Sequence, residues 1–153
     1  MNDELYHHGI KGQKWGVRRY QNKDGTLTDA GKKRQAKEIK NLNRVGTFVQ
    51  NSARTQTSIK NMAKNYKQKL DSTTNAAERY ELSNAIYNLN SQYSSSVKFE
   101  VKNLKKYKKI EDKIMKKYGN MPIEDLIKSN DKLTAKDLSD REAYNQYFKQ
   151  RGN

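Results

Sequence analysis

Residues 76–118 read AAERYELSNAIYNLNSQYSSSVKFEVKNLKKYKKIEDKIMKKY. Apolar side chains recur in this stretch every three or four positions, at Leu82, Ile86, Leu89, Tyr93, Val97, Val101, Leu104, Tyr107, Ile110, Ile114 and Tyr118. Such a stripe is typical of helices that pack in coiled-coil fashion. We therefore predict one long helix or, because the three serines at 94–96 are poor helix formers, two antiparallel helices that fold back at that point.

A second helical region precedes the stripe. Thr28 has the side chain of an N-cap, and it is expected to begin a basic helix over about residues 29–44. Gly46 is expected to end or kink that helix. An amphipathic helix is then predicted from Val45 to Leu70, and the sequence DSTTN at 71–75 provides a break before the stripe.

Short helices are predicted after the stripe. Gly119 and Asn120 should end the long helix, and Pro122 suits the first turn of a helix over 122–129. The run from Ser139 to Glu142 resembles a capping box at the start of a last helix. We therefore predict an all-α protein, either an elongated helical bundle or a coiled-coil-like hairpin, with a small N-terminal β-hairpin arm. Its expected regions are the arm over 1–28, a basic helical region over 29–119 and short neutral helices over 120–153.

The charge of the chain is strongly unbalanced. Its 153 residues include 32 Lys and Arg against 17 Asp and Glu, a formal net charge of +15 at pH 7. Residues 120–153 carry six basic and six acidic side chains, so the excess lies before them. A field of this kind attracts polyanions: nucleic acid, an anionic membrane surface or an acidic protein surface.

The hydropathy of the chain limits the kind of core it can form. Only 33% of the residues are hydrophobic and the mean hydropathy is −1.23, which favours thin helical packing over a thick globular core. The absence of cysteine excludes disulfides and thiolate metal sites. No apolar run approaches the roughly 18 residues that span a bilayer, so we expect no membrane partner.

Residues 7–20, HHGIKGQKWGVRRY, do not fit a helix, because three glycines interrupt them. We expect an extended, turn-rich arm around Trp15. A small β-hairpin is predicted over its second half and the residues that follow, with a strand at 16–20, a turn at 22–25 and a return at 26–27.

The run from His7 to Arg34, HHGIKGQKWGVRRYQNKDGTLTDAGKKR, resembles a short N-terminal module of proteins of tailed phages and prophages of Gram-positive bacteria. The module has the approximate pattern H-x-G-x-K-G-x-K/R-W-G-V-R-R-Y/F-Q-N-x-D-G-S/T-L-T-x-x-G-x-x-R, and its members usually lie among virion structural genes. The resemblance rests on Trp15, Gly16, Gly25 and Gly31 with their spacing. It implies a phage context and no particular activity.

The arm is the first candidate binding site. Its cations, Lys11, Lys14, Arg18 and Arg19, would contact nucleic-acid phosphates while Trp15 stacks on an unpaired base. One alternative is that Trp15 forms the core of the hairpin and the cations are a solvated face. Another is that the arm is a docking peptide for a capsid or portal surface.

A lysine-rich face of the long stripe is the second candidate. We call it the lysine ridge and define it by Lys102, Lys105, Lys106, Lys109 and Lys113. It would hold the backbone of duplex DNA without sequence preference, because lysine is a point charge rather than a bidentate reader of bases. The alternative is a solvated face that keeps the helix soluble.

The sequence offers little for catalysis or metal binding. It has no glycine-rich phosphate loop and no cysteine nucleophile, and His7 and His8 have no further ligands at a suitable spacing. We predict no enzymatic activity, no metal site and no cofactor.

These observations favour a non-enzymatic phage structural-module protein, a minor head or internal virion component that binds packaged DNA or the head shell by charge. We expect non-specific contact with DNA or with phage head proteins, an acidic host protein as a further possible partner, and self-association through the stripe. The expected location is the host bacterial cytoplasm and then the virion. The alternatives are a small phage-encoded inhibitor or anti-defence protein that acts on a host nucleic-acid machine, and a nucleic-acid-binding regulator.

Overall fold

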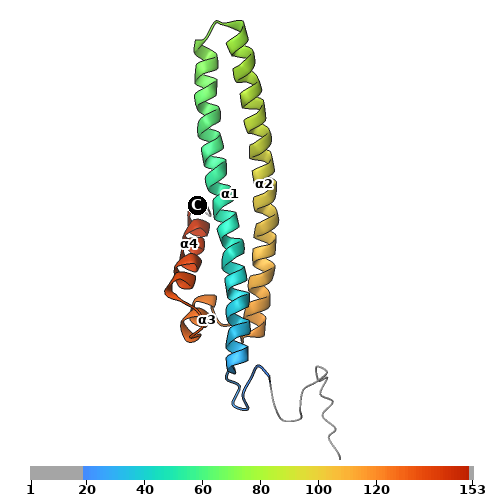
Figure 1. Ribbon diagram of the computed structural model, residues 1–153, viewed down its shortest axis with the longest axis vertical. Helices are drawn as coiled ribbons and strands as arrows, with labels where there is room; N and C mark the ends of the chain where they lie inside the picture. Colours follow the sequence, from blue (N-terminus) through green and yellow to red (C-terminus); the bar gives the residue numbers. More distant parts are fainter. Residues whose placement is uncertain (1–18, 152–153) are drawn as a thin grey trace, which may run out of the picture.

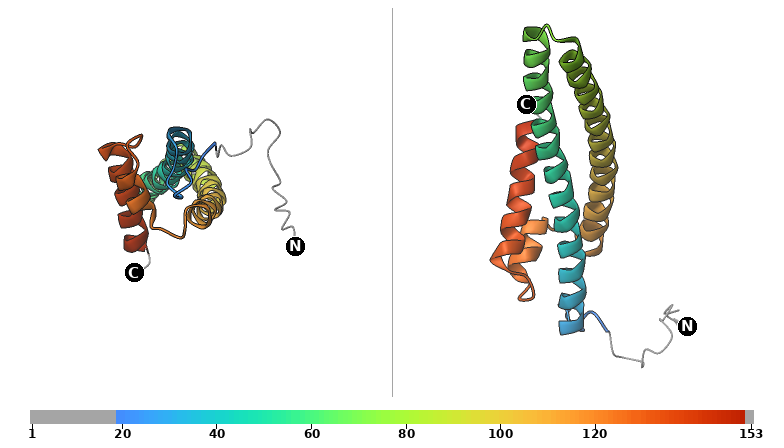
Figure 2. Two further views of the ribbon diagram at one scale, coloured as in Figure 1. Left: turned by 90° about the horizontal axis from the view of Figure 1, so that it is seen from below. Right: turned by 45° about the horizontal axis from the view of Figure 1, so that its top comes forward.

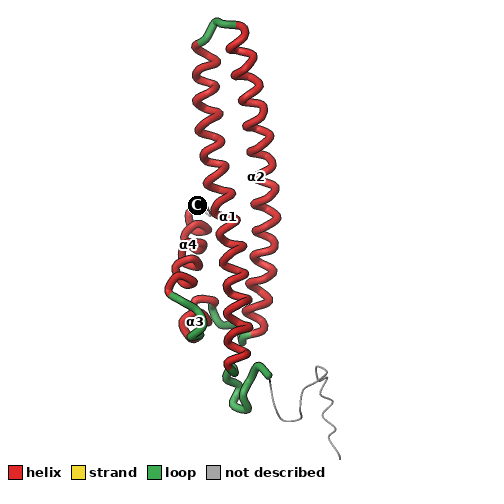
Figure 3. Tube along the Cα trace, in the orientation of Figure 1, coloured by secondary structure: helices red, strands yellow, loops and turns green. Residues whose placement is uncertain are grey.

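A computed structural model describes residues 19–151, which form four helices and no β-strand (Figures 1 and 3). Helices α1 (Asp29–Ser72) and α2 (Ala76–Lys117) make a long antiparallel hairpin. The shorter α3 (Ile123–Ser129) and α4 (Ala135–Arg151) pack near the end where α1 begins, and both views in Figure 2 place α4 beside α1. The predictions of an all-α class and an elongated hairpin are confirmed.

Helix α1 runs through Gly46 without a break, so the prediction of a helix end there was wrong. A Cβ atom at this position would lie 3.0 Å from Cδ2 of Tyr144 and 3.1 Å from Cε2 of Tyr107. These two rings are stacked, with centroids 3.8 Å apart. The glycine is therefore needed for close packing of a tyrosine pair against α1, and its role is not conformational.

Helix α2 is also continuous, so the predicted fold-back at the three serines does not occur. The hydroxyl of Ser96 donates to the carbonyl oxygen of Ser52 in α1 at 3.2 Å. Small side chains at this level allow the two helix backbones to approach each other. Helix α1 covers most of the apolar stripe of α2 within one chain, although Val101 stays 45% exposed. Self-association through the stripe stays a prediction.

The helix ends follow the predicted capping chemistry at three places. The Thr28 hydroxyl accepts a hydrogen bond from the Gly31 amide at 3.1 Å, and Asn75 caps α2 by accepting from two amides. Gly119 and Asn120 both adopt left-handed backbone angles, φ +80° and +57°, which end α2. These local signals are confirmed.

The start of α4 differs from the prediction. Its cap is Thr134, whose amide donates to the Asp137 carboxylate at 2.8 Å while the Asp137 amide donates back to the Thr134 hydroxyl at 3.4 Å. This is the reciprocal pattern of a capping box. The predicted box from Ser139 to Glu142 lies inside α4 and was wrong by about one helical turn.

The hydrophobic core is confined to the end of the hairpin that α3 and α4 cover. Its buried members are Ile39, Leu42, Val45, Val49, Tyr107, Ile114, Ile123, Leu126, Ile127 and Tyr144. Towards the other end of the hairpin, Ile59 and Leu89 are the buried apolar side chains among the described residues. No helix between residues 19 and 151 has the length and apolar character needed to cross a membrane.

A buried ion cluster holds α3 and α4 against this core. Arg141 of α4 is only 8% exposed and binds Glu111 of α2 at 2.6 Å and Glu124 of α3 at 2.8 Å. It also donates to the hydroxyl of Tyr107, and burial raises the pKa of that hydroxyl, which stays protonated. One guanidinium group thus connects three helices.

Candidate nucleic-acid interface

Residues 19–28 form a tight turn that leads into α1. Gln21 and Leu27 make a single antiparallel bridge, and the Asn22 amide donates to the Thr26 carbonyl oxygen at 2.8 Å. Gly25 closes the turn with φ +87°, a backbone angle that favours glycine. The predicted turn at 22–25 is present, but most of the predicted first strand lies outside the described residues, so the β-hairpin arm stays a prediction.

The turn is attached to α1 through the N-cap. The Thr28 hydroxyl donates to the carbonyl oxygen of Arg19 at 2.7 Å, and the Thr28 amide donates to the carbonyl oxygen of Tyr20 at 3.2 Å. A Cβ atom on Gly31 would lie 2.2 Å from that same Tyr20 oxygen. Only glycine therefore allows the chain at Tyr20 to cross the first turn of α1 this closely.

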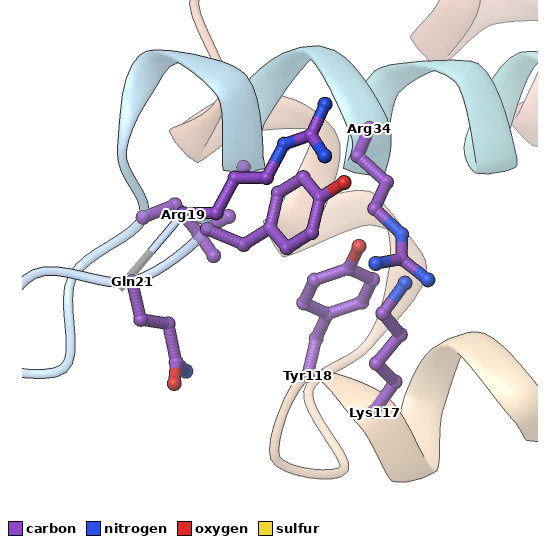
Figure 4. A pocket seen from close by; sticks show the side chains of 8 residues that line it. Arg19, Gln21, Arg34, Lys117 and Tyr118 are labelled. Carbon is purple, nitrogen blue, oxygen red and sulfur yellow. The ribbon is translucent and has the colours of Figure 1, made fainter. Parts of the chain in front are cut away.

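This crossing creates a pocket of about 300 Å³ between the turn, α1 and the end of α2. We call it the tyrosine pocket; the lining residues that matter here are Arg19, Tyr20, Gln21, Arg34, Lys117 and Tyr118. The guanidinium of Arg34 lies 4.8 Å from the Tyr20 ring centroid and that of Arg19 lies 5.4 Å from it. Figure 4 shows the side chains of Arg34 and Lys117 ending close together beside Tyr118.

Glu38 is the carboxylate that faces these cations. Lys117 binds it at 2.5 Å, the hydroxyl of Tyr118 donates to it at 3.0 Å, and Arg34 lies 3.4 Å away. Burial would raise the pKa of Glu38, but the hydrogen bonds from Lys117 and Tyr118 outweigh it, so the pKa is lowered and the group is ionised at neutral pH. Arg19, Arg34 and Lys117 line the pocket, and Glu38 balances one of these three positive charges, which leaves two in excess.

The lysine ridge forms one face of α2. Its five members include the neighbours Lys105 and Lys106 and are otherwise three or four residues apart, and all are exposed. Asn103, Tyr107 and Ile114 lie buried on the other side of the helix. Within residues 19–151 none of the five forms an ion pair. The ridge therefore presents uncompensated charge to solvent.

Two further lysines extend this face. Lys98 and Lys116 continue the same three-and-four spacing and are exposed. At 1.5 Å per residue, the face from Lys98 to Lys116 is about 27 Å long. Lys98 was missed by sequence reasoning, although extending the spacing one step towards the N-terminus would have found it.

The predicted basic helix over residues 29–44 was not named as part of a candidate site. Lys37, Lys40 and Arg44 are exposed and line a second hollow together with Tyr20 and Arg34. The two hollows share these last two residues. The basic part of α1 and the tyrosine pocket consequently form one continuous surface.

Of the predicted arm residues, Arg19 alone lies in the described part of the chain, where it is exposed at the tyrosine pocket. Lys11, Lys14, Trp15 and Arg18 lie outside it. Between residues 19 and 151 no three His, Cys, Asp or Glu side chains come together in a group that could hold a metal ion. The arrangement is suited to binding an anion.

The match to a known family covers the start of the chain. Residues 1–22 match a family described as "Family of unknown function (DUF7211)". Neither the curated proteins nor the solved structures contain a match.

Proposed function

We propose that this chain is a non-enzymatic phage structural-module protein, a minor head or internal virion component that binds packaged DNA by charge. The observation that carries the proposal is the lysine ridge, whose five ammonium groups are exposed and without ion pairs among residues 19–151. The resemblance of residues 7–34 to a phage module supports the setting.

The geometry of the ridge favours phosphate contact over base recognition. Duplex DNA carries one negative charge per about 1.7 Å of its axis, so a basic face about 27 Å long can lie beside many phosphates at once. Lysines at helical spacing supply point charges and lack the planar fork that reads guanine. Binding should therefore be independent of sequence and strongly dependent on salt.

The arm adds to the same interface in this proposal. Arg19 lies beside the tyrosine pocket, so the arm residues that precede it are joined to the chain at the basic end of the hairpin. Lys11, Lys14 and Arg18 would then extend the charged surface, with Trp15 stacking on a base or forming the core of a β-hairpin.

The test is binding to a random-sequence duplex across a salt series. A ridge variant carries Gln at Lys102, Lys105, Lys106, Lys109 and Lys113. Each phosphate contact contributes about 0.9 to the slope of log binding constant against log salt, so losing five should flatten the slope by up to about 4.5.

The matched control removes the same charge elsewhere. It carries Gln at five exposed cations of α1 towards the far end of the hairpin: Arg54, Lys60, Lys64, Lys67 and Lys69. We expect this variant to keep most of the wild-type slope. Equal losses in both variants would show that net charge acts diffusely. Absence of binding at low salt would exclude DNA and direct attention to the head shell or an acidic host protein.

A further inference from the structure

We propose that the tyrosine pocket binds one unpaired nucleotide, including its phosphate, at a strand end or in a single-stranded gap of a nucleic acid. The inference rests on the proposed function, because it assigns a second, distinct element of the same nucleic-acid interface. The lysine ridge would hold duplex backbone, whereas the pocket would hold a base that a duplex does not offer.

The pocket has unused donors for a phosphate. Within residues 19–151 Arg19 forms no ion pair, and the 3.4 Å contact of Arg34 with Glu38 uses only its Nε. Lys117 gives one of its three N–H groups to Glu38 at 2.5 Å. A phosphate entering here would meet several free N–H groups and offset the two excess positive charges.

The pocket also has a stacking surface for a base. The guanidinium groups of Arg19 and Arg34 lie 5.4 and 4.8 Å from the centroid of the Tyr20 ring. Nucleobases stack on tyrosine rings and on arginine planes, and every base has a face that can do so. A base inserted between Tyr20 and Tyr118 would thus add to the cation–π contacts that Arg19 and Arg34 already make with Tyr20.

The size and position of the pocket select an unpaired nucleotide. Its volume of about 300 Å³ lies at the lower end for small-molecule sites, so it accommodates one nucleotide and not a base pair. The pocket opens between the turn at 19–27 and the end of α2. Its lining residue Lys117 directly follows Lys116, and Lys116 extends the face of the ridge. A strand leaving a duplex held on the ridge would reach it directly.

The experiment compares single-stranded and duplex binding by fluorescence anisotropy in the full-length chain. The probes are a 5′-phosphorylated, 3′-labelled ten-residue oligothymidylate and a blunt duplex. Tyr20→Leu should weaken single-strand binding about tenfold, as expected for loss of one stacked base, and leave duplex binding within twofold. Tyr20→Phe keeps the ring and should bind as the wild type does. Tyr87→Leu, at a tyrosine 74% exposed towards the far end of the hairpin, is the control.

Competition separates a nucleotide from a bare anion. Thymidine monophosphate should displace the single strand, and inorganic phosphate at equal concentration should not. Equal displacement by phosphate would reduce the pocket to an anion site and overturn the inference, as would unchanged binding in Tyr20→Leu.

The ridge variant distinguishes the two proposals. Suppose that the wild type binds the duplex, that the ridge variant does not, and that Tyr20→Leu binds the single strand as the wild type does. The pocket inference then fails and the proposed function stands. If neither probe binds the wild type, both proposals fail. Circular dichroism of each variant excludes loss of fold as the cause.

Discussion

Replacing Arg141 by alanine tests whether one buried cation holds α3 and α4 on the hairpin. The side chain is 9% exposed, and its loss leaves Glu111 and Glu124 without their cationic partner, although Asn145 still donates a hydrogen bond to Glu124. Breaking a buried ion pair costs about 3–5 kcal/mol. Both carboxylates keep about a quarter of their surface in water, at 24% and 26% exposure, so they can be rehydrated. We therefore expect a loss of about 3 kcal/mol, the lower end of this range.

The loss is measured by urea unfolding followed by circular dichroism, with thermal melting as a second readout. At about 2–4 °C per kcal/mol for a chain of this size, the melting temperature should fall by roughly 6–12 °C. Hydrogen exchange should rise in α3 and α4 more than in the middle of α1. Arg54→Ala removes an exposed arginine and should change the stability by less than about 0.5 kcal/mol. A change below about 1 kcal/mol in Arg141→Ala would refute the reasoning.

Three further changes test other contacts. Gly31→Ala places a methyl group against the Tyr20 carbonyl oxygen, 2.2 Å away, so the turn should detach from α1, and NMR shifts of Tyr20 should move towards random-coil values. Gly46→Ala gains about 1 kcal/mol of helix propensity, but its methyl group would crowd two tyrosine rings at 3.0 and 3.1 Å. Overpacking costs about 1–3 kcal/mol, so urea unfolding should show a net loss of unfolding free energy. Burial would raise the pKa values of Glu38 and Glu124, yet hydrogen bonds from Lys117 and Arg141 lower both overall. A carboxylate whose pKa is lower in the folded state stabilises the fold fully at pH values above its unfolded pKa of about 4.3. This stabilisation is lost as the pH falls through the folded-state pKa. The urea midpoint should therefore stay level from pH 7 to 5 and decline below about pH 4.

The starts of α1 and α2 and the end of α2 could be predicted because they depend on neighbours in sequence. Thr28 and Asn75 each need only the amides two or three residues ahead, and Gly119 needs only freedom of its own backbone angles. Gly46 could not be interpreted in this way. Its contacts come from Tyr107 and Tyr144, which lie far along the chain, and a glycine that admits a ring has the same sequence signal as one that ends a helix.

The two parts of the candidate interface differ in the same way: one depends on neighbours in sequence and the other on residues far apart in the chain. The lysine ridge lies on one helix, so its spacing alone placed all five lysines on one face. The tyrosine pocket was missed because it joins Tyr20 to Tyr118 from opposite ends of the hairpin sequence. A hint was available in Gly31: an exposed basic helix has no reason for a glycine in its first turn unless another segment crosses there.

The layout of the hairpin places the two proposed binding elements at the same end. Helix α2 is 42 residues long, about 63 Å, yet its ridge lies in the half that ends at the tyrosine pocket. Arg19 and Arg34 occupy the same end, so in the proposed complex the cations of the turn, α1 and α2 would contact one stretch of the partner. The hydrophobic core and the Arg141 cluster stabilise this end, whereas the far end has few buried apolar side chains among the described residues. A rigid, basic end is what phosphate binding requires, because cations held in place lose less entropy when a polyanion docks.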